Sequence, residues 1–265
     1  MIPIFNLIIS AIGIFLTSLI FSMFGRGGGE FYLPIMISLL PIDYYTAAGI
    51  SLFIIMLQGL SMLIVYHGRH RLVDWGLALV LGFAIGLASF LGGYLSYRIP
   101  AYLLKLSFSI FLIISAYYLY KGVAVKAKVG RIGTWRRKLD NQEYYVNLAY
   151  IIPPIIIAAF TAGMAGISGG GLIIPICILL GGVPIRVAMG TNTFLVLSSA
   201  SMSFMGHFVR GGFNPMLALI YGLLVVLGSQ IGSRMHIKIN EKRLRQAFSA
   251  ILVIASIWML IKIFI

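Results

Sequence analysis

Long apolar runs separated by short polar stretches dominate the chain. A helix that crosses a bilayer needs about 20 mainly apolar residues. Eight runs approach or exceed that length: 5–24, 46–66, 74–97, 99–120, 147–165, 187–206, 216–233 and 247–265. Two shorter runs, 31–41 and 172–182, follow glycine clusters and are too short to cross alone. The pattern predicts an all-α, polytopic integral membrane protein with about eight full transmembrane helices and two short segments.

The two short runs belong to an internal repeat. Pro34 and Pro175 lie 141 residues apart, and this offset pairs GRGGGEFYLP at 25–34 with GISGGGLIIP at 166–175 without a gap. A slip to an offset of 140 continues the pairing as far as Phe108 and Phe248. We therefore expect two homologous halves and a connection between them: a first transmembrane repeat at 1–120, a basic cytoplasmic linker at 121–145 and a second transmembrane repeat at 146–265.

The composition excludes a soluble globular fold. The chain is 60% hydrophobic and 10% charged, whereas an ordinary soluble domain is about a quarter charged. The formal net charge of +14 comes from Lys and Arg residues that lie between the apolar runs, where such residues determine topology. We expect a multi-pass protein of the cytoplasmic membrane that is surrounded by lipid and has no nucleic-acid partner.

The distribution of basic residues favours inverted halves, because Lys and Arg gather on the cytoplasmic side. With the linker inside, inverted halves place 16 basic residues inside and 4 outside, whereas parallel halves place 11 inside and 7 outside and leave Arg26 and Arg186 unassigned. The inverted arrangement puts both termini outside and needs an odd number of crossings per half. Five helices satisfy that condition, and so do three helices with one re-entrant hairpin. No basic residue precedes Arg26, so we expect the first run to stay as a membrane segment rather than act as a cleaved signal.

The sequence lacks the motifs of several enzyme classes. The chain contains no HExxH, no GxSxG and no P-loop, and it has no ATP-binding module. The single Cys177 excludes an intrachain disulfide and a multi-cysteine metal site, and it leaves a noncovalent homodimer open. We expect a protein that is not an enzyme and that uses no cofactor or metal. An intramembrane enzyme is the least favoured alternative.

The two glycine clusters point to one binding site. Irregular backbone is tolerated at membrane depth only where it is buried in protein or lines an aqueous cavity. Transporters with inverted repeats bind substrate between discontinuous helices, whose N-termini attract anions. A close helix-packing surface is the alternative for the glycines, and an interhelical polar contact is the alternative for Asn192. The candidate substrate-binding residues are Arg26, Gly27, Gly28, Gly29, Ser168, Gly169, Gly170, Gly171, Thr191, Asn192 and His207.

Charged and titratable residues near the breaks carry two interpretations each. Glu30 is the acid that lies directly in a glycine break, and it is a candidate for proton coupling. The alternative makes Glu30 a helix-start carboxylate or an ion-pair partner of Arg26, four residues earlier. His207 ends the run that carries Asn192, and its alternative role is an interfacial histidine.

These motifs resemble those of the sulfite exporter TauE/SafE family. The resemblance rests on the doubled glycine break with its following proline and on A-x-G-T-N-x-F at 188–194, and it covers nearly the whole chain. It implies a prokaryotic-type plasma-membrane permease for a small sulfur-containing anion, such as sulfite, sulfoacetate or a related organosulfonate. From the two inverted repeats we expect it to work by alternating access. A permease for another small solute, or for a cation coupled through Glu30, is the alternative.

The first half departs from the second within the motif. Arg26 stands where the second half has Ile167, Glu30 where it has Gly171, and Ser51 where it has Asn192. We therefore expect an asymmetric site with its polar side chains drawn mainly from the second half.

Overall fold

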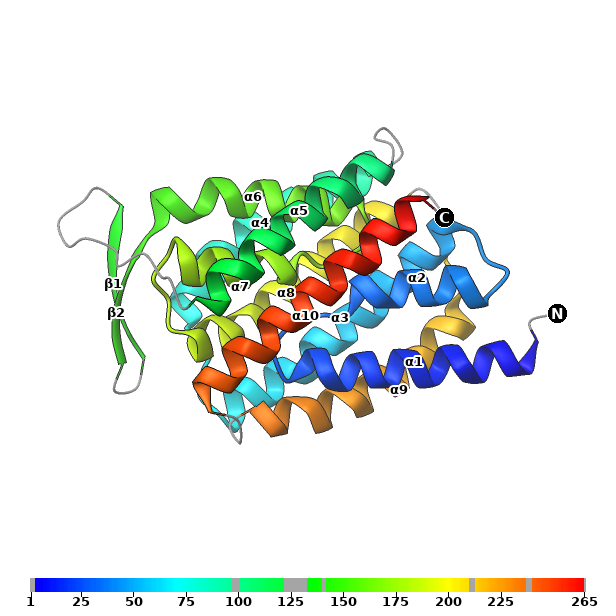
Figure 1. The fold of residues 1–265 in the computed structure, drawn as a ribbon, viewed down its shortest axis with the longest axis horizontal. Helices are drawn as coiled ribbons and strands as arrows, with labels where there is room; N and C mark the ends of the chain where they lie inside the picture. Colours follow the sequence, from blue (N-terminus) through cyan, green and yellow to red (C-terminus); the bar gives the residue numbers. More distant parts are fainter. Residues whose placement is uncertain are drawn as a thin grey trace.

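The computed structural model describes residues 3–96, 101–121, 133–139, 142–209, 213–236 and 240–264, and within these ranges it is mostly helical (Figure 1). The helices of the first half are α1 Ile4–Ser22, α2 Gly29–Leu39, α3 Tyr44–Gly68, α4 Trp75–Leu95 and α5 Ala101–Tyr120. Those of the second half are α6 Leu148–Met164, α7 Gly170–Leu179, α8 Ile185–Phe208, α9 Pro215–Met235 and α10 Glu241–Phe264. Each predicted run coincides with one helix, and the two short runs form the two short helices.

Polar side chains start several of the helices. Asp43 accepts a hydrogen bond from Thr46 N at 3.0 Å at the start of α3. Asp74 and Asn214 do the same for α4 and α9, each at 3.1 Å from the backbone nitrogen three residues later. Side chains of this kind stabilise a helix because its first N–H groups have no partner within the helix.

The helices of the two halves follow the offset of the sequence repeat. α2 and α7 begin 141 residues apart, as do α3 and α8, and α4 and α9 begin 140 residues apart. The halves also interlock reciprocally: α4 packs against α6 and α8, and α9 packs against α1 and α3. Small residues allow this approach, because a methyl group on Gly92 would overlap the Phe160 carbonyl and one on the equivalent Gly232 would overlap the Leu19 carbonyl.

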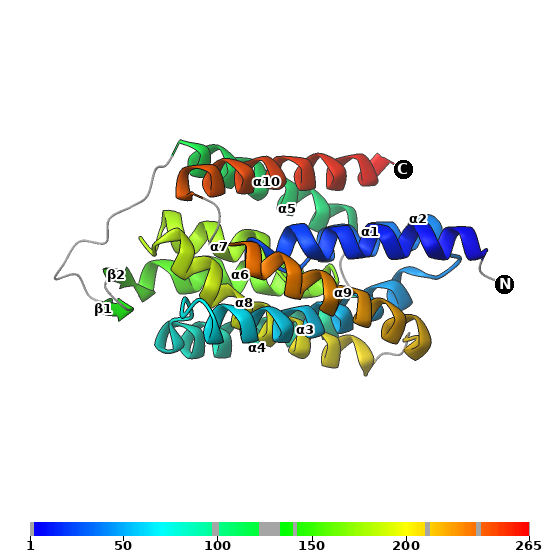
Figure 2. The same cartoon turned by 90° about the horizontal axis from the view of Figure 1, so that it is seen from below.

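The two short helices lie towards opposite ends of the molecule. α1 begins and α10 ends at one end, and a β-hairpin lies at the other (Figure 1). α2 lies towards the end where α1 begins, and α7 lies towards the hairpin (Figures 1 and 2). Figure 2 shows α10 along one edge of the bundle and α3 and α4 along the opposite edge, with α7 between them.

The outer surface is apolar in the way that a lipid surrounding requires. Helices α1, α3, α4 and α9 are long and apolar enough to cross a membrane. Phe5, Phe83 and Met216 expose 71%, 73% and 73% of their surface, and contiguous apolar exposure of this extent is unusual on a soluble monomer. Many Ser residues, Gln58 and Asn192 are buried instead. The chain is therefore a mostly helical membrane protein.

The linker contains structure that the hydropathy pattern does not predict. Strands β1 Thr134–Leu139 and β2 Gln142–Asn147 form an antiparallel hairpin in which Arg137 pairs with Tyr144. Part of the basic linker expected over 121–145 therefore has regular secondary structure. Residues 122–132 and 140–141 of the linker lie outside the described residues.

Candidate functional site

Two breaks in the helices, each at a glycine cluster, form the centre of the candidate site. Gly25 has φ +63° and Gly166 has φ +71°, and these residues are equivalent in the repeat. This left-handed conformation is accessible to glycine without the steric cost that a Cβ atom adds. It ends α1 and α6 and lets the chain turn back into α2 and α7.

The two breaks pack directly against each other. A methyl group on Gly27 would lie 2.8 Å from Ser168 Oγ, and one on Gly29 would lie 3.2 Å from Ile167 Cα. A methyl group on Gly171 would lie 2.5 Å from Arg26 Nη2. All three distances are shorter than an ordinary van der Waals contact, so these positions need glycine for the halves to meet. The structure therefore brings the glycine clusters of the two repeats to one place.

A buried ion pair lies at this meeting point. Arg26 Nη2 donates to Glu30 Oε1, and the two residues are 0% and 2% exposed. Two aromatic rings face the guanidinium, Phe21 at 4.8 Å and Phe248 at 5.8 Å from ring centroid to Cζ. Desolvated contacts of this kind stabilise a cation. The structure thus contains the ion pair that the alternative interpretation of Glu30 predicts.

Several buried polar atoms around the ion pair have no hydrogen-bond partner among the described residues. Buried polar groups are nearly always hydrogen-bonded, so a group of unpaired ones marks a place where a ligand or water is expected. The unpaired atoms at or beside the breaks are Arg26 Nε, Arg26 Nη1, Glu30 Oε2, Ser51 Oγ, Ser168 Oγ and Asn192 Oδ1.

Asn192 joins the two breaks. Its Nδ2 donates to the Gly25 carbonyl at 2.8 Å, and a methyl group on Gly170 would lie 3.0 Å from the same nitrogen. The side chain is fully buried in α8, and its Oδ1 has no partner within the described ranges. Asn192 therefore reaches both glycine clusters and keeps one acceptor unused.

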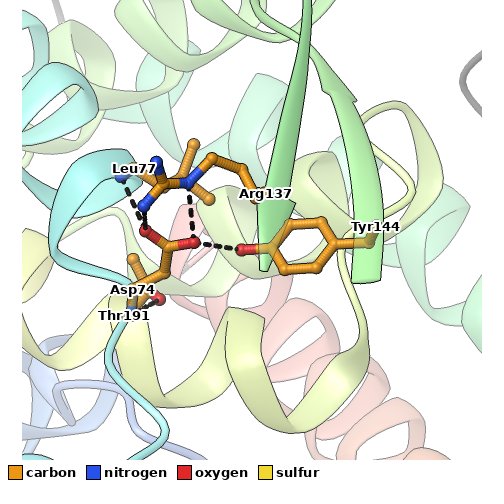
Figure 3. Close-up of polar contacts among 5 residues, drawn as sticks. All are labelled: Asp74, Leu77, Arg137, Tyr144 and Thr191. Atoms are coloured by element: carbon orange, nitrogen blue, oxygen red, sulfur yellow. Dashed lines mark hydrogen bonds and ion pairs between the residues drawn. The ribbon is translucent and has the colours of Figure 1, made fainter. Parts of the chain in front are cut away.

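Other sequence candidates have different surroundings. Gly28 N donates to Gln58 Oε1 at 3.2 Å, which occupies that amide. Gly169 adopts φ +66° at the start of α7 and packs against Ala162. Thr191 Oγ1 accepts from Asp74 N at 3.1 Å, on the side of α8 that faces the start of α4 (Figure 3).

His207 lies at the second break, far from Asn192: the Gly163 carbonyl that it contacts also accepts from Gly166 N at 3.2 Å. It lies 15 residues after Asn192 on α8, which corresponds to about 22 Å along a helix. Its Nε2 bonds to the Gly163 carbonyl at 3.1 Å. The equivalent residue of the first half, Tyr66, bonds to the equivalent carbonyl of Ser22 at 3.0 Å. This matched pair places one side chain from each half at the helix end that precedes a break, and a substrate-binding role for His207 stays a prediction.

Gln58 of α3 also contacts the first glycine break. Its Oε1 accepts from Gly28 N and from Tyr32 Oη, and its Nε2 donates to Ser22 Oγ at 2.9 Å. An amide in the middle of the apolar run 46–66 is the sequence signal that could have identified it. The contact of Phe248 with Arg26 has no such signal. No group of three or more His, Cys, Asp and Glu side chains that could hold a metal occurs in the part of the chain that the structure describes.

Comparison with known proteins identifies the family of the chain. The sequence profile described as sulfite exporter TauE/SafE matches residues 10–259. The chain belongs to this family. A probable membrane transporter protein of Bacillus subtilis, YunE, is 29% identical over 83% of the chain and 84% of its own length. A probable membrane transporter protein of Methanocaldococcus jannaschii is 26% identical over 93% and 92%.

A plant relative carries the family name. The sulfite exporter TauE/SafE family protein 6 of Arabidopsis thaliana is 23% identical over 85% of the chain and 73% of its own length. No solved structure matches the chain. The family and the names of its members make this TauE/SafE chain a multi-pass membrane transporter.

Proposed function

We propose that the protein moves a small sulfur-containing anion, of the sulfite, sulfoacetate or organosulfonate class, across the cytoplasmic membrane by alternating access. The observation that carries the proposal is the buried guanidinium of Arg26, whose Nε and Nη1 have no hydrogen-bond partner among the described residues at the place where the two glycine breaks meet. Guanidinium N–H groups form strong, directed hydrogen bonds to oxyanions. The hydroxyl of Ser168 is a further donor within the same group.

The ion pair serves function better than it serves stability. The second break forms with Ile167 and Gly171 at the positions equivalent to Arg26 and Glu30, so the backbone turn needs no charges. Burying an ion pair gains little stability over apolar side chains of similar size. The charges at this position are therefore best explained by a ligand, with Arg26 as its cation and Glu30 as a proton-coupling group.

The arrangement of the halves supports alternating access. α1 and α6 begin at opposite ends of the molecule (Figure 1), as inverted repeats would. α1 with α2, and α6 with α7, form hairpins of one long and one short helix, which favours three crossings and one re-entrant hairpin per half. The breaks meet between the halves, where inverted-repeat transporters bind substrate. The cytoplasmic position of the linker, with both termini outside, stays a prediction.

Thermal-shift measurements on the detergent-purified protein test the site. A ligand that binds the folded state raises apparent stability. We expect stabilisation by sulfite or sulfoacetate that exceeds that by acetate, and we expect Asn192→Ala to remove it while the unliganded protein stays folded. Ser199→Ala, a buried polar change on the same helix, is the matched control. Equal stabilisation of wild type and Asn192→Ala would remove Asn192 from the site.

A cation permease is the second candidate, because Glu30 Oε2 is buried and has no partner within the described ranges. In that case simple cations stabilise the protein and sulfur anions do not. Glu30→Gln would then abolish cation transport, whereas an anion site built on Arg26 keeps its ligand when Glu30 is neutral.

A further inference from the structure

The linker hairpin is attached to the bundle through one buried carboxylate. Asp74 is 1% exposed, and its carboxylate accepts hydrogen bonds from Leu77 N at 3.1 Å, Arg137 Nε at 3.0 Å and Tyr144 Oη at 2.7 Å. Arg137 Nη2 also pairs with it, so the guanidinium binds the carboxylate through two nitrogens. Figure 3 shows Arg137 and Tyr144 reaching from the two strands to this single acid.

The hairpin presents one face to Asp74 and the other to solvent. Arg137 and Tyr144 are direct cross-strand partners, and partners of this kind lie on the same face of a sheet. Arg136 lies on the opposite face, since successive side chains alternate. It pairs with Glu143 at 2.8 Å, and its side chain is 65% exposed. The neighbouring arginines therefore have different surroundings, one in contact with the bundle and one on the surface.

The charge of Asp74 exceeds what the helix start needs. Asn214 occupies the equivalent position of the second half and caps α9 with the same geometry, at 3.1 Å from Leu217 N. Asn and Asp are comparable as N-cap residues. A neutral amide would thus serve for capping at position 74, and the carboxylate is explained by its contacts with Arg137 and Tyr144.

The attachment spans both halves of the transporter. Asp74 starts α4 in the first half, and its backbone N–H donates to Thr191 of α8 in the second half. Tyr144 and Cys177 of α7 belong to the same buried apolar cluster. Thr191 precedes Asn192, and α7 begins at the second glycine break. Elements that form the site are therefore held together at the end of the molecule that carries the hairpin.

Gly76 provides the space that Arg137 needs. A methyl group at Gly76 would overlap the guanidinium of Arg137, although a non-glycine residue is otherwise acceptable in the first turn of α4. Gly76→Ala would therefore displace Arg137 from Asp74 without changing any charge.

We propose that the β1–β2 hairpin is a latch, which holds the hairpin-facing end of the transporter closed through Asp74, Arg137 and Tyr144 and opens the path to the site when it is released. The latch rests on the proposed function only in one respect, namely that the path it closes leads to a substrate site. In the present structure the latch is closed, and Arg26, Ser168 and Asn192 are fully buried.

The electrostatics of the latch agree with a closed, charged pair. Burial alone would raise the pKa of the Asp74 carboxyl, but hydrogen bonds from Arg137 and Tyr144 outweigh burial and hold the pKa below its ordinary value. The hydrogen bond to Asp74 raises the pKa of Arg137. Both groups therefore stay ionised at neutral pH.

Cys177 is a natural reporter of the latch, because it is the single cysteine of the chain, is 3% exposed and belongs to the same buried cluster as Tyr144. The rate of its reaction with a maleimide is measured on the purified full-length protein. We expect slow labelling of wild type and of the control Arg136→Gln. Arg137→Gln and Gly76→Ala should label faster by roughly tenfold or more, the factor that corresponds to the loss of one charged hydrogen bond. Equal rates in all four proteins would overturn the latch.

A second reporter tests whether the latch controls the path to the site. In a Cys177→Ala background, Ser168→Cys places a thiol at the meeting point of the breaks. Release of the latch by Gly76→Ala should accelerate labelling there as well. Acceleration at Cys177 without acceleration at position 168 would show that the hairpin covers α7 but does not control access to the site. Melting temperatures that stay well above the labelling temperature show that the accelerated labelling does not come from unfolding.

These labelling rates need no substrate, so they are independent of the proposed anion. If wild type shows no stabilisation by any sulfur anion while both thiols respond to the latch variants, the latch stands and the substrate assignment fails. The reverse pattern is stabilisation by a sulfur anion with unchanged labelling rates. It would support the substrate assignment and overturn the latch.

Discussion

Arg26→Met should destabilise the protein strongly, and a second substitution should restore it. The change leaves the Glu30 carboxylate 2% exposed and without its cation. Removing one partner of a buried ion pair costs about 3–5 kcal/mol, whereas replacing both partners by uncharged side chains of similar volume is often neutral. Arg26→Met/Glu30→Gln should therefore recover most of the stability that Arg26→Met loses.

The size of the effect can be measured by thermal denaturation in detergent. Domains of 150–250 residues lose about 2–4 °C in melting temperature per kcal/mol, so Arg26→Met should melt about 6–20 °C below wild type. The double variant should melt close to wild type. Arg69→Met changes an exposed arginine and should have little effect on the melting temperature.

Anion binding separates the structural role of Arg26 from its functional role. Both Arg26→Met and the stable double variant lack the guanidinium, so neither should be stabilised by sulfite. If Arg26→Met has the same melting temperature as wild type, the reasoning about a buried, compensated ion pair is refuted. If the double variant keeps its stabilisation by sulfite, Arg26 does not hold the anion.

Three further predictions address packing, charge and topology. Gly171→Ala should weaken anion-dependent stabilisation, because its methyl group would lie 2.5 Å from Arg26 Nη2, whereas Gly68→Ala should not, because nothing lies within 4 Å of that position; a thermal-shift titration compares them. The pKa of Asp74 is held below its ordinary 3.8, so its carboxylate stabilises the fold fully above that pH and less as the pH falls through the lowered pKa. The difference in melting temperature between wild type and Asp74→Asn should therefore shrink at acidic pH, and a constant difference would contradict the pKa shift. Tags before α1 and within residues 122–132 should react with an impermeant reagent from opposite sides of the membrane, and labelling from the same side would contradict the inverted topology.

The helices and the centre of the site could be predicted because their causes are local in the sequence. Apolar runs of bilayer length set the long helices, and the repeat offset located both glycine breaks without knowledge of contacts. Arg26, Ser168 and Asn192 were identified because polar groups beside breaks in apolar runs are exceptional. Their convergence in the structure follows from the two halves meeting at equivalent positions.

The remaining features depend on tertiary contacts that no local pattern records. The hairpin strands are short and rich in charge, and they are stabilised by Asp74, which lies more than 60 residues earlier in the sequence. Phe248 faces Arg26 because of the position of α10 in the bundle, which no local sequence pattern indicates. His207 and Asn192 lie on one helix but contact different parts of the breaks, His207 the end of α6 and Asn192 the Gly25 carbonyl, and this difference is set by tertiary packing.

Transport of sulfite or sulfoacetate in proteoliposomes of purified protein tests the central claim most directly. Efflux of the loaded anion is compared among wild type, Asn192→Ala and Ser199→Ala. We predict protein-dependent efflux of the sulfur anion that is retained in Ser199→Ala and lost in Asn192→Ala, with little movement of acetate. Efflux that is absent from wild type, or that is unchanged in Asn192→Ala, would contradict an anion path through the site formed by the two glycine breaks.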